Sequence, residues 1–237
     1  MNALKITLEA RYPLRLPLSY SHVIQGMLYN CLKESLPGLH DSGWTDGNRV
    51  FRMFTFGQLQ GKYTINGIFI VFEGPVKLEI RSASPEIIDA IAEYLLVERS
   101  VRFGKDVFPI INLEASNRLL FTESSYIKMV SYLTVHTTTE DGKTIYYSPF
   151  DEEFEVLIRR NTEYKLRAAG LNTPDKFRIV PDKKTIRKKI TRFKGIIVEG
   201  YVGCFMLETS IEAITLLYYA GLGDRNSQGF GMFEVIE

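Results

Sequence analysis

The sequence predicts an α+β protein in which the order strand, helix, strand, strand, helix, strand occurs twice. Segments that alternate polar and apolar residues are typical of half-buried strands, and segments with apolar residues every three or four positions are typical of amphipathic helices. These segments follow one another in the same order in each half of the 237 residues. With 45% hydrophobic and 12% aromatic residues, the chain has ample material for one large or two small buried cores.

The first half is expected to have the order βαβ(ββ)αβ. Its elements are strand 3–11, helix 20–36, strands 50–57, 63–72 and 75–81, helix 84–98 and strand 107–114. Ser84 is expected to cap the second helix, because Pro85 follows it in the first turn, where a missing backbone N–H costs nothing.

The second half follows a short polar stretch at 115–118 and repeats the order βαββαβ. Its elements are strand 126–137, helix 150–169, strands 177–190 and 194–206, helix 210–220 and strand 230–236. Each half is therefore expected to form a ferredoxin-like (RRM-like) βαββαβ domain, a four-stranded antiparallel sheet with two helices on one face. The boundaries expected are 1–118 for the N-terminal domain and 119–237 for the C-terminal domain.

The first helix is expected to have an apolar face and an opposite face of different character. The apolar stripe is Val23, Ile24, Met27, Leu28, Cys31 and Leu32. The opposite face carries His22, Gly26, Tyr29 and Lys33, so Tyr29 is not predicted to lie in the core. Gly26 inside a helix costs about 1 kcal/mol relative to alanine, and close approach by a ligand or another segment would justify it. An ordinary surface tyrosine beside a glycine is the alternative.

Basic residues are concentrated in one part of the chain, although the net charge is only +1. The basic stretch, 183–194, contains seven cations and no acid: Lys183, Lys184, Arg187, Lys188, Lys189, Arg192 and Lys194. Such clustering favours a nucleic-acid contact, and a solvated surface strand is the alternative.

A glycine-rich loop is expected at 221–231, Gly-Leu-Gly-Asp-Arg-Asn-Ser-Gln-Gly-Phe-Gly. Glycine permits positive φ and close backbone approach, so the loop could press its amides and polar side chains against a nucleic-acid backbone. The residues expected to bind in this way are Gly221, Gly223, Arg225, Asn226, Ser227, Gly229 and Gly231. The loop lacks the Gly-Lys-Ser/Thr ending of a triphosphate-binding loop, and a tight structural turn is the alternative.

The sequence excludes several classes of site. Cys31 and Cys204 stand alone and no histidines are clustered, so we expect no disulfide framework, metal or cofactor. No segment resembles a signal peptide or reaches membrane-spanning length, so the protein is expected to be soluble and cytoplasmic.

Two residues after the first helix are candidates for a catalytic role. His40 lies among turn-forming residues, where it should be exposed and free to titrate near neutral pH. Arg52 begins a strand-like run. Both could also be ordinary surface residues.

The glycine-rich loop resembles the C-terminal motif of the CRISPR repeat-RNA endoribonucleases of the RAMP superfamily. These enzymes cut precursor CRISPR RNA within each repeat. The resemblance extends, in the family's order and across essentially the full chain, to 25–29, 39–43, 54–56 and 193–195. It implies two tandem ferredoxin-like domains and metal-independent cleavage by His40, Tyr29 and Arg52. The family often has lysine where Arg52 stands; arginine keeps the charge but cannot lose a proton, so only an electrostatic role is expected of it.

The implied chemistry uses the RNA's own 2′-hydroxyl as nucleophile. It needs a base, an acid for the leaving 5′-oxygen and positive charge for the phosphorane. We expect His40 to be the acid and Tyr29 to position or deprotonate the 2′-hydroxyl, although the reverse assignment is open. His22 is a second candidate for proton transfer, with a solvated helix-start residue as the alternative, and His136 is expected to be structural.

The expected partner is CRISPR repeat RNA, bound by a monomer or a homodimer, with CRISPR effector subunits as further partners. Two other classes remain open. One is a non-catalytic RNA-binding subunit of an effector complex; the other is a small-molecule enzyme or regulatory domain of the same fold, which would not need the basic stretch.

Overall fold

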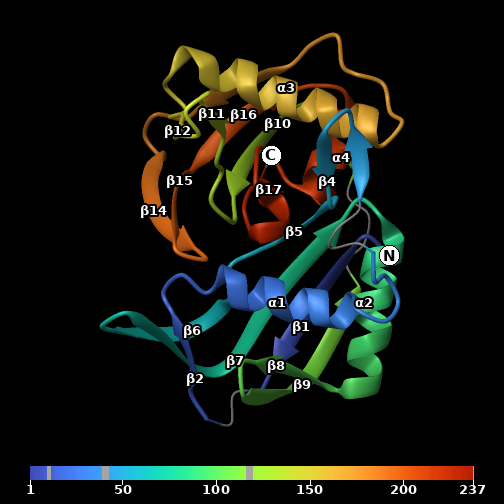
Figure 1. Ribbon diagram of the computed structural model, residues 1–237, viewed down its shortest axis with the longest axis vertical. Coiled ribbons are helices and arrows are strands. Elements are labelled where there is room, and N and C mark those ends of the chain that lie inside the picture. Colours follow the sequence, from blue (N-terminus) through green and yellow to red (C-terminus); the bar gives the residue numbers. More distant parts are fainter. Residues whose placement is uncertain (10–11, 39–42, 116–119, 237) are drawn as a thin grey trace.

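The computed structural model describes residues 1–9, 12–38, 43–115 and 120–236, and has two β-sheet-rich halves (Figure 1). In the first half, β7 (Phe69–Ser82) is the longest strand, and every pairing in the sheet is antiparallel. The sheet has the order β2-β7-β1-β9-β8, and β5 and β6 also pair with β7. These strands are β1 (Ala3–Leu8), β2 (Leu14–Pro17), β5 (Phe54–Phe56), β6 (Gln60–Asn66), β8 (Ser100–Phe103) and β9 (Asp106–Ala115).

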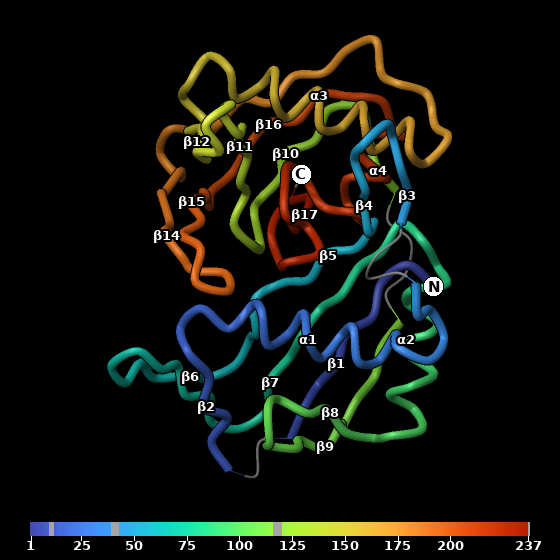
Figure 2. The backbone as a smooth tube through the Cα atoms, in the orientation of Figure 1, coloured from blue at the N-terminus to red at the C-terminus, as the bar shows by residue number. Residues whose placement is uncertain are grey.

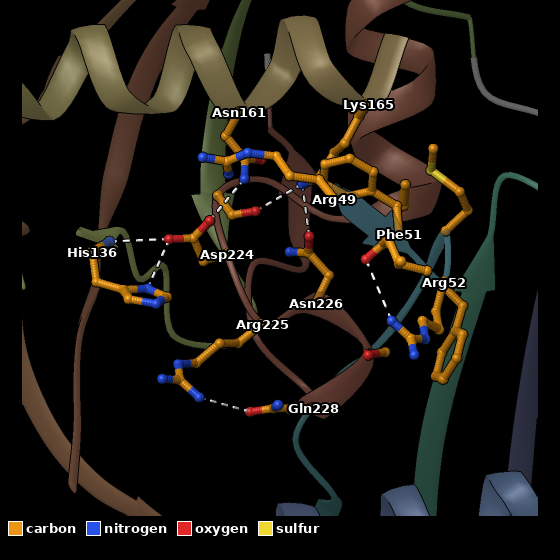
Figure 3. A pocket seen from close by; sticks show the side chains of 16 residues that line it. Arg49, Phe51, Arg52, His136, Asn161, Lys165, Asp224, Arg225, Asn226 and Gln228 are labelled. Atoms are coloured by element: carbon orange, nitrogen blue, oxygen red, sulfur yellow. Dashed lines mark hydrogen bonds and ion pairs between the residues drawn. The ribbon is translucent and has the colours of Figure 1, made fainter. Parts of the chain in front are cut away.

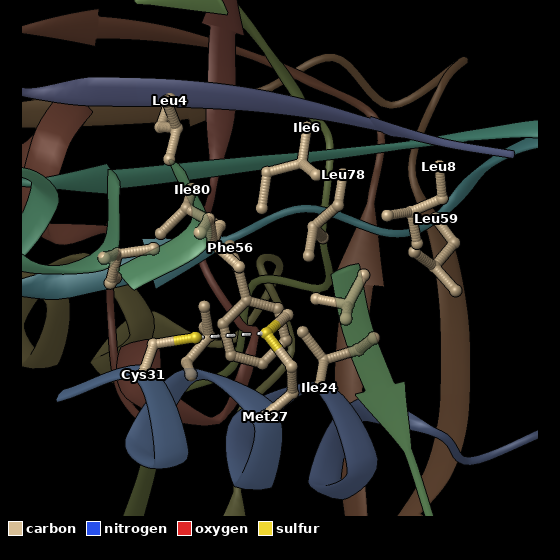
Figure 4. Packing of buried hydrophobic residues seen from close by; sticks show 14 of the residues in the cluster. Leu4, Ile6, Leu8, Ile24, Met27, Cys31, Phe56, Leu59, Leu78 and Ile80 are labelled. Carbon is tan, nitrogen blue, oxygen red and sulfur yellow. Dashed lines mark hydrogen bonds between the residues drawn. The ribbon is translucent and has the colours of Figure 1, made fainter. Parts of the chain in front are cut away.

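Two helices, α1 (Ser21–Leu32) and α2 (Pro85–Glu98), pack on one face of this sheet. In Figure 4, Ile24, Met27 and Cys31 of α1 point toward Phe56 and Ile80 of the sheet. The predicted apolar stripe of the first helix is thus the face that packs on the sheet. Ser84 occupies the predicted N-cap position of α2, but its side chain makes no capping hydrogen bond.

The second half contains a four-stranded antiparallel sheet in the order β13-β16-β10-β17. Its strands are β10 (Ser124–Met129), β13 (Arg178–Pro181), β16 (Cys204–Glu208) and β17 (Phe233–Val235). Side chains of α3 (Glu152–Ala168) and α4 (Ile211–Ala220) pack with the sheet in one hydrophobic core. Among the described residues, no helix has the length and apolar character needed to cross a membrane.

Within the described residues, three two-stranded hairpins lie outside the main sheets. They are β3 (Trp44–Asp46) with β4 (Arg49–Phe51), β11 (His136–Thr138) with β12 (Thr144–Tyr146), and β14 (Arg187–Phe193) with β15 (Ile196–Val202). The β3–β4 hairpin belongs to the first half by sequence but packs against α3 of the second (Figure 1). Arg167 of α3 pairs with Asp46 at 2.9 Å, and Arg49 lies over the ring of Tyr164.

All four predicted helices are present in the predicted order, but strands β2, β3, β8 and β12 were not predicted, and several predicted strands have other limits. The strand expected at 50–57 is divided at Met53, whose φ of 51° turns the chain out of the β3–β4 hairpin and into β5. The predicted break between the strands expected at 63–72 and 75–81 was wrong. The turn falls at Gly67–Ile68, because Gly67 supplies the positive φ, and β7 continues through Gly74.

The same happens in the second half. The strand expected at 126–137 leaves the sheet after Met129, and the strand expected at 177–190 ends at Pro181. A turn at Asp182 follows, in which Thr185 donates its backbone N–H to the Asp182 carbonyl, and the chain then begins β14. The two predicted domain limits meet in 116–119, outside the described residues, and stay a prediction.

Candidate functional site

The glycine-rich loop joins α4 to β17 and contains a short 3-10 helix, η1 (Asn226–Gln228). Its glycines adopt the left-handed region, with φ of 90° at Gly221, 70° at Gly223, 87° at Gly229 and 77° at Gly231. Arg225 also has a positive φ, of 58°. The expected requirement for positive φ at Gly229 is therefore confirmed.

These glycines lie against other parts of the same chain. A Cβ added at Gly229 would overlap the ring of Phe56, and one at Gly231 would overlap the carbonyl of Leu222. Figure 2 shows the loop beside β5, the strand that carries Phe56. The close approach predicted from the glycines is thus made by the protein itself. Contact of the four glycines with RNA stays a prediction.

Lys165 of α3 holds the loop from inside. Its Nζ donates to the carbonyl oxygens of Gly221 and Gly223, both at 2.7 Å, and to Oδ1 of Asn226 at 2.6 Å. The side chain is only 2% exposed. Burial lowers the pKa of Lys165 to about 7, and the charge of Asp224 acts in the opposite direction.

Asp224, within the loop, has partners on two other elements. One carboxylate oxygen lies 2.8 Å from His136 Nδ1 and accepts the backbone N–H of His136 at 3.0 Å. The other accepts from Asn161 Nδ2 at 2.7 Å. Burial raises the pKa of Asp224, but the hydrogen bonds and charge of His136, with the charge of Lys165, outweigh burial and lower it.

A pocket of about 370 Å³ lies between β4, α3 and the glycine-rich loop (Figure 3). We name it the arginine pocket, because Arg49, Arg52 and Arg225 all line it. Asp224 also lines the pocket, but its carboxylate is engaged by His136 and Asn161. The pocket is therefore suited to a negatively charged ligand.

The arginine pocket brings together predicted residues from both halves of the chain. Arg52 from the first half shares it with Gly223, Arg225, Asn226 and Ser227 of the loop. Gly221, Gly229 and Gly231 do not line it.

Tyr29 lies beside this pocket rather than in it. Its ring meets that of Phe54 edge-on at 6.0 Å between centroids, and Phe54 lines the pocket. Tyr29 is half-buried and is not one of the buried core residues, as predicted, but it packs against the first core instead of facing fully into solvent. The reason is that Phe54, at the start of β5, reaches this side of α1.

The two remaining catalytic candidates lie elsewhere. His22 lines a separate pocket of about 490 Å³ with Gly26 and Tyr94, and its Nδ1 is 2.9 Å from the carbonyl oxygen of Ser19. His40 lies outside the described residues. Among the residues that the structure describes, no group of three or more His, Cys, Asp and Glu side chains is placed to share a metal ion.

The basic stretch runs from the turn before β14 to the turn after it. All seven of its cations are exposed: Lys183, Lys184, Arg187, Lys188, Lys189, Arg192 and Lys194. None lines the arginine pocket. Lys188 forms an ion pair at 2.7 Å with Glu199 on β15, an acidic residue that lies outside the basic stretch in sequence. The hairpin reaches the first half where Thr191 Oγ1 lies 3.2 Å from Ser19 Oγ.

Sequence reasoning missed several residues around the loop. Lys165 and Asn161 look like ordinary polar residues of a charged helix, and nothing local indicates that they are buried. Arg49 gave no signal. Asp224 lies in the predicted loop, and a lone acidic residue among hydrogen-bond donors was the signal that could have marked it as a residue with a specific role. His136, expected to be structural, has Asp224 as a partner and also lines the pocket.

Comparison with known proteins identifies the family. The family described as CRISPR associated protein Cas6, C-terminal, matches residues 114–235. The CRISPR-associated endoribonuclease Cas6 of Pyrococcus furiosus is 23% identical over 229 residues, covering 93% of this chain and 84% of that protein. CRISPR-associated endoribonuclease Cas6 1 of Methanocaldococcus jannaschii is 26% identical over 239 residues, covering 94% and 88%.

Solved structures share the fold. The product of a Cas6-related gene from Pyrococcus furiosus superposes with a TM-score of 0.86 at 21% identity, over 100% of this chain and 98% of that one. A RAMP protein that binds different RNA substrates gives a TM-score of 0.84 at 20% identity, over 100% of both chains. This chain therefore belongs to the Cas6 family of CRISPR-associated proteins.

Proposed function

We propose that this protein is a site-specific endoribonuclease that cuts precursor CRISPR RNA within its repeats without a metal ion. The observation that carries the proposal is the arginine pocket, where Arg52 and three polar residues of the glycine-rich loop meet around one anion-binding space. The names of the two Cas6 relatives support the same activity.

The proposed architecture is two tandem ferredoxin-like domains. The support is strand order. The sheets contain the successions β9-β1-β7-β5 and β17-β10-β16-β13, in which the first and last strands of each half lie side by side. This is the 4-1-3-2 arrangement expected of a βαββαβ unit when β5 and β13 are taken as the second strands.

In the proposed reaction, the 2′-oxygen of one nucleotide attacks the adjacent phosphorus and the bond to the 5′-oxygen breaks. The products are a 2′,3′-cyclic phosphate and a 5′-hydroxyl. His40 donates the proton that the 5′-oxygen takes up, and Tyr29 positions the 2′-hydroxyl or accepts its proton. The reverse assignment of acid and base remains the alternative.

Arg52 contributes charge to this reaction. The phosphorane carries more negative charge than the phosphodiester, so fixed cations in the pocket stabilise the transition state more than the ground state. Arg49 and Arg225 line the same pocket and share this role. His22 is the weaker candidate for proton transfer, because it lines a different pocket from Arg52.

RNA binding divides between long-range charge and direct contact. The exposed cations of the basic stretch suit the phosphates of a repeat stem or of unpaired flanking RNA. Arg225, Asn226 and Ser227 are the residues proposed to touch RNA near the scissile step. Effector subunits as further partners, and the choice between monomer and homodimer, stay predictions.

The test is incubation of the purified protein with repeat RNA in excess EDTA. We expect one cut per repeat, a 2′,3′-cyclic phosphate and a 5′-hydroxyl. A 2′-deoxy substitution at the nucleotide 5′ of the break should stop cutting and leave affinity nearly unchanged, because only the nucleophile is removed.

The other outcomes identify the rival functions. Binding without cutting would indicate a non-catalytic RNA-binding subunit. Neither binding nor cutting would indicate a small-molecule enzyme or regulatory domain. Efficient cutting of the deoxy RNA would overturn the mechanism.

A further inference from the structure

A buried amide connects α1 to the glycine-rich loop. Gln25 is 8% exposed, and its Nε2 donates to the carbonyl oxygen of Ser227 at 2.9 Å, across 202 residues of sequence. Gln25 and Tyr29 are four residues apart on α1, so they are neighbours on one side of the helix. The hydrogen bond therefore fixes α1 one turn away from the proposed catalytic tyrosine.

The loop end of this hydrogen bond is itself held in place. Asn226, which precedes Ser227, accepts a hydrogen bond from Lys165 and donates its amide to the carbonyls of Leu222 and Phe230, both at 3.1 Å. Lys165 has three ammonium protons and donates to three acceptors, all within the loop. The position of the Ser227 carbonyl is thus set from α3, through Lys165 and Asn226.

A second set of interactions joins the same loop to β5. Thr55 Oγ1 donates to the Phe230 carbonyl at 3.0 Å, and Gly229 lies against the ring of Phe56. The residue before Thr55, Phe54, meets Tyr29 and lines the arginine pocket. The loop therefore supports both elements that border the proposed site, α1 and β5.

We propose that Gln25 and Lys165 are positioning residues for RNA cleavage. The glycine-rich loop acts as a strut, a rigid segment that keeps α1 in place. Lys165 fixes the conformation of the loop, and the hydrogen bond from Gln25 fixes α1 relative to the loop. Tyr29 is thereby held in a set place relative to RNA bound at Arg52. This inference rests on the proposed function. It gives the loop an internal role in catalysis in addition to any contact with RNA, and a displacement of about 1 Å at a reacting group can lower a rate by roughly 10²-fold.

The first test is Gln25→Leu, which removes the donor and keeps a side chain of similar size. We expect the single-turnover cleavage rate to fall by about tenfold, with affinity for uncleavable 2′-deoxy repeat RNA within about twofold of the parent. Ile179→Val, a small truncation at a buried residue of β13, is the control for reduced stability. It should leave the cleavage rate unchanged. A parental rate in Gln25→Leu would overturn the inference.

The second test asks whether Gln25 acts through Tyr29. In a Tyr29→Phe background, Gln25→Leu should slow cleavage by less than about twofold further, because the group that it positions is already gone. If the rate reduction of the double variant equals the product of the two single reductions, Gln25 does not act through Tyr29 and the inference is overturned. A Tyr29→Phe protein that cuts at the parental rate would instead overturn the role given to Tyr29 in the proposed function, and the tyrosine step of the inference with it.

The third test does not depend on activity. Lys165→Met and Gln25→Leu should each speed amide hydrogen exchange within α1 and within 221–231, whereas Ile179→Val should not. If Lys165→Met fails to fold, Gln25→Leu alone decides. Unchanged exchange in α1 would overturn the inference even if the protein cuts RNA. Faster exchange in α1 of a protein that binds repeat RNA without cutting it would support the strut and overturn the proposed enzyme function.

Discussion

Gly229→Ala should destabilise the fold through a collision that the structure locates. Gly229 has a φ of 87°, and an added Cβ would overlap the ring of Phe56, which is 1% exposed. Placing an L-residue in the left-handed region costs about 1–2 kcal/mol. Overpacking against a fixed core ring costs about 1–3 kcal/mol more. The free energy of unfolding should therefore fall by roughly 2–5 kcal/mol, which for a chain of this size lowers Tm by roughly 4–20 °C.

The same substitution at Gly26 is a matched control of opposite sign. Gly26 lies inside α1, and a Cβ added there would meet no atom within 4 Å. Alanine is the better helix former by about 1 kcal/mol, so Gly26→Ala should raise stability by up to that amount. If Gly26→Ala is more stable yet binds repeat RNA less tightly, the ligand approach suggested by this glycine is supported.

The assay is thermal and denaturant unfolding of both variants and of the double variant Gly229→Ala/Phe56→Leu. Shortening the ring should relieve the overlap, so the double variant should be destabilised by less than the sum of the two single effects. A Gly229→Ala protein that melts within a degree or so of the parent would refute the reasoning. So would strict additivity, because the steric overlap with Phe56 would then carry no energy.

Three further predictions concern catalysis, binding and pH. His40→Ala should slow single-turnover cleavage by about 10² or more with little change in RNA affinity, and Arg52→Ala should slow it less; a parental rate in His40→Ala would make His22 the leading candidate. A second variant replaces three cations of β14 with Gln: Lys188, Lys189 and Arg192. The slope of log affinity for RNA against log salt concentration should fall by roughly 0.7–0.9 for each phosphate that is no longer neutralised. An unchanged slope would show that the basic stretch is a solvated surface. The pKa of Asp224 is lower in the folded state than in the unfolded state. The ionised Asp224 carboxylate therefore contributes its full stabilisation of the fold above the unfolded-state pKa, and this contribution is lost as pH falls toward the folded-state pKa. Asp224→Asn should therefore destabilise the protein at pH 7 more than at pH 3 in denaturant unfolding, and equal destabilisation at both would contradict this.

Local patterns predicted the four helices and many of the sheet strands, because these segments have their own periodicity and their own turn signals. They failed where the choice of partner decided the structure. The strand expected at 177–190 includes 187–190, which in the structure belong to β14 and pair with β15 in a separate hairpin. In this hairpin four consecutive side chains, 187–190, are exposed, whereas a strand with one face on a core exposes every second one; that difference depends on the packing partner and not on the segment alone.

The candidate site was predictable in its parts but not in its assembly. Glycine indicated positive φ in the loop, and positive φ is a property of the backbone itself. For two of these glycines the atoms that press against them come from distant sequence: the ring beside Gly229 belongs to Phe56 on β5, and the carbonyl oxygen beside Gly223 belongs to Thr134. The burial of Lys165 was equally invisible, since a lysine on an amphipathic helix is normally exposed and only the loop's carbonyl oxygens make its burial tolerable.

The two halves share a small hydrophobic cluster, and that cluster has a consequence for synthesis of the protein. Met53 from the first half packs with Leu166, Leu216 and Ala220 from the second. During translation, Met53 leaves the ribosome well before these partners exist, so the early chain carries an apolar surface that it cannot cover by itself. The arginine pocket, whose walls come from the same two regions, is then among the last parts of the molecule to take shape. A newly made chain would have a complete arginine pocket only after its second half has folded onto the first.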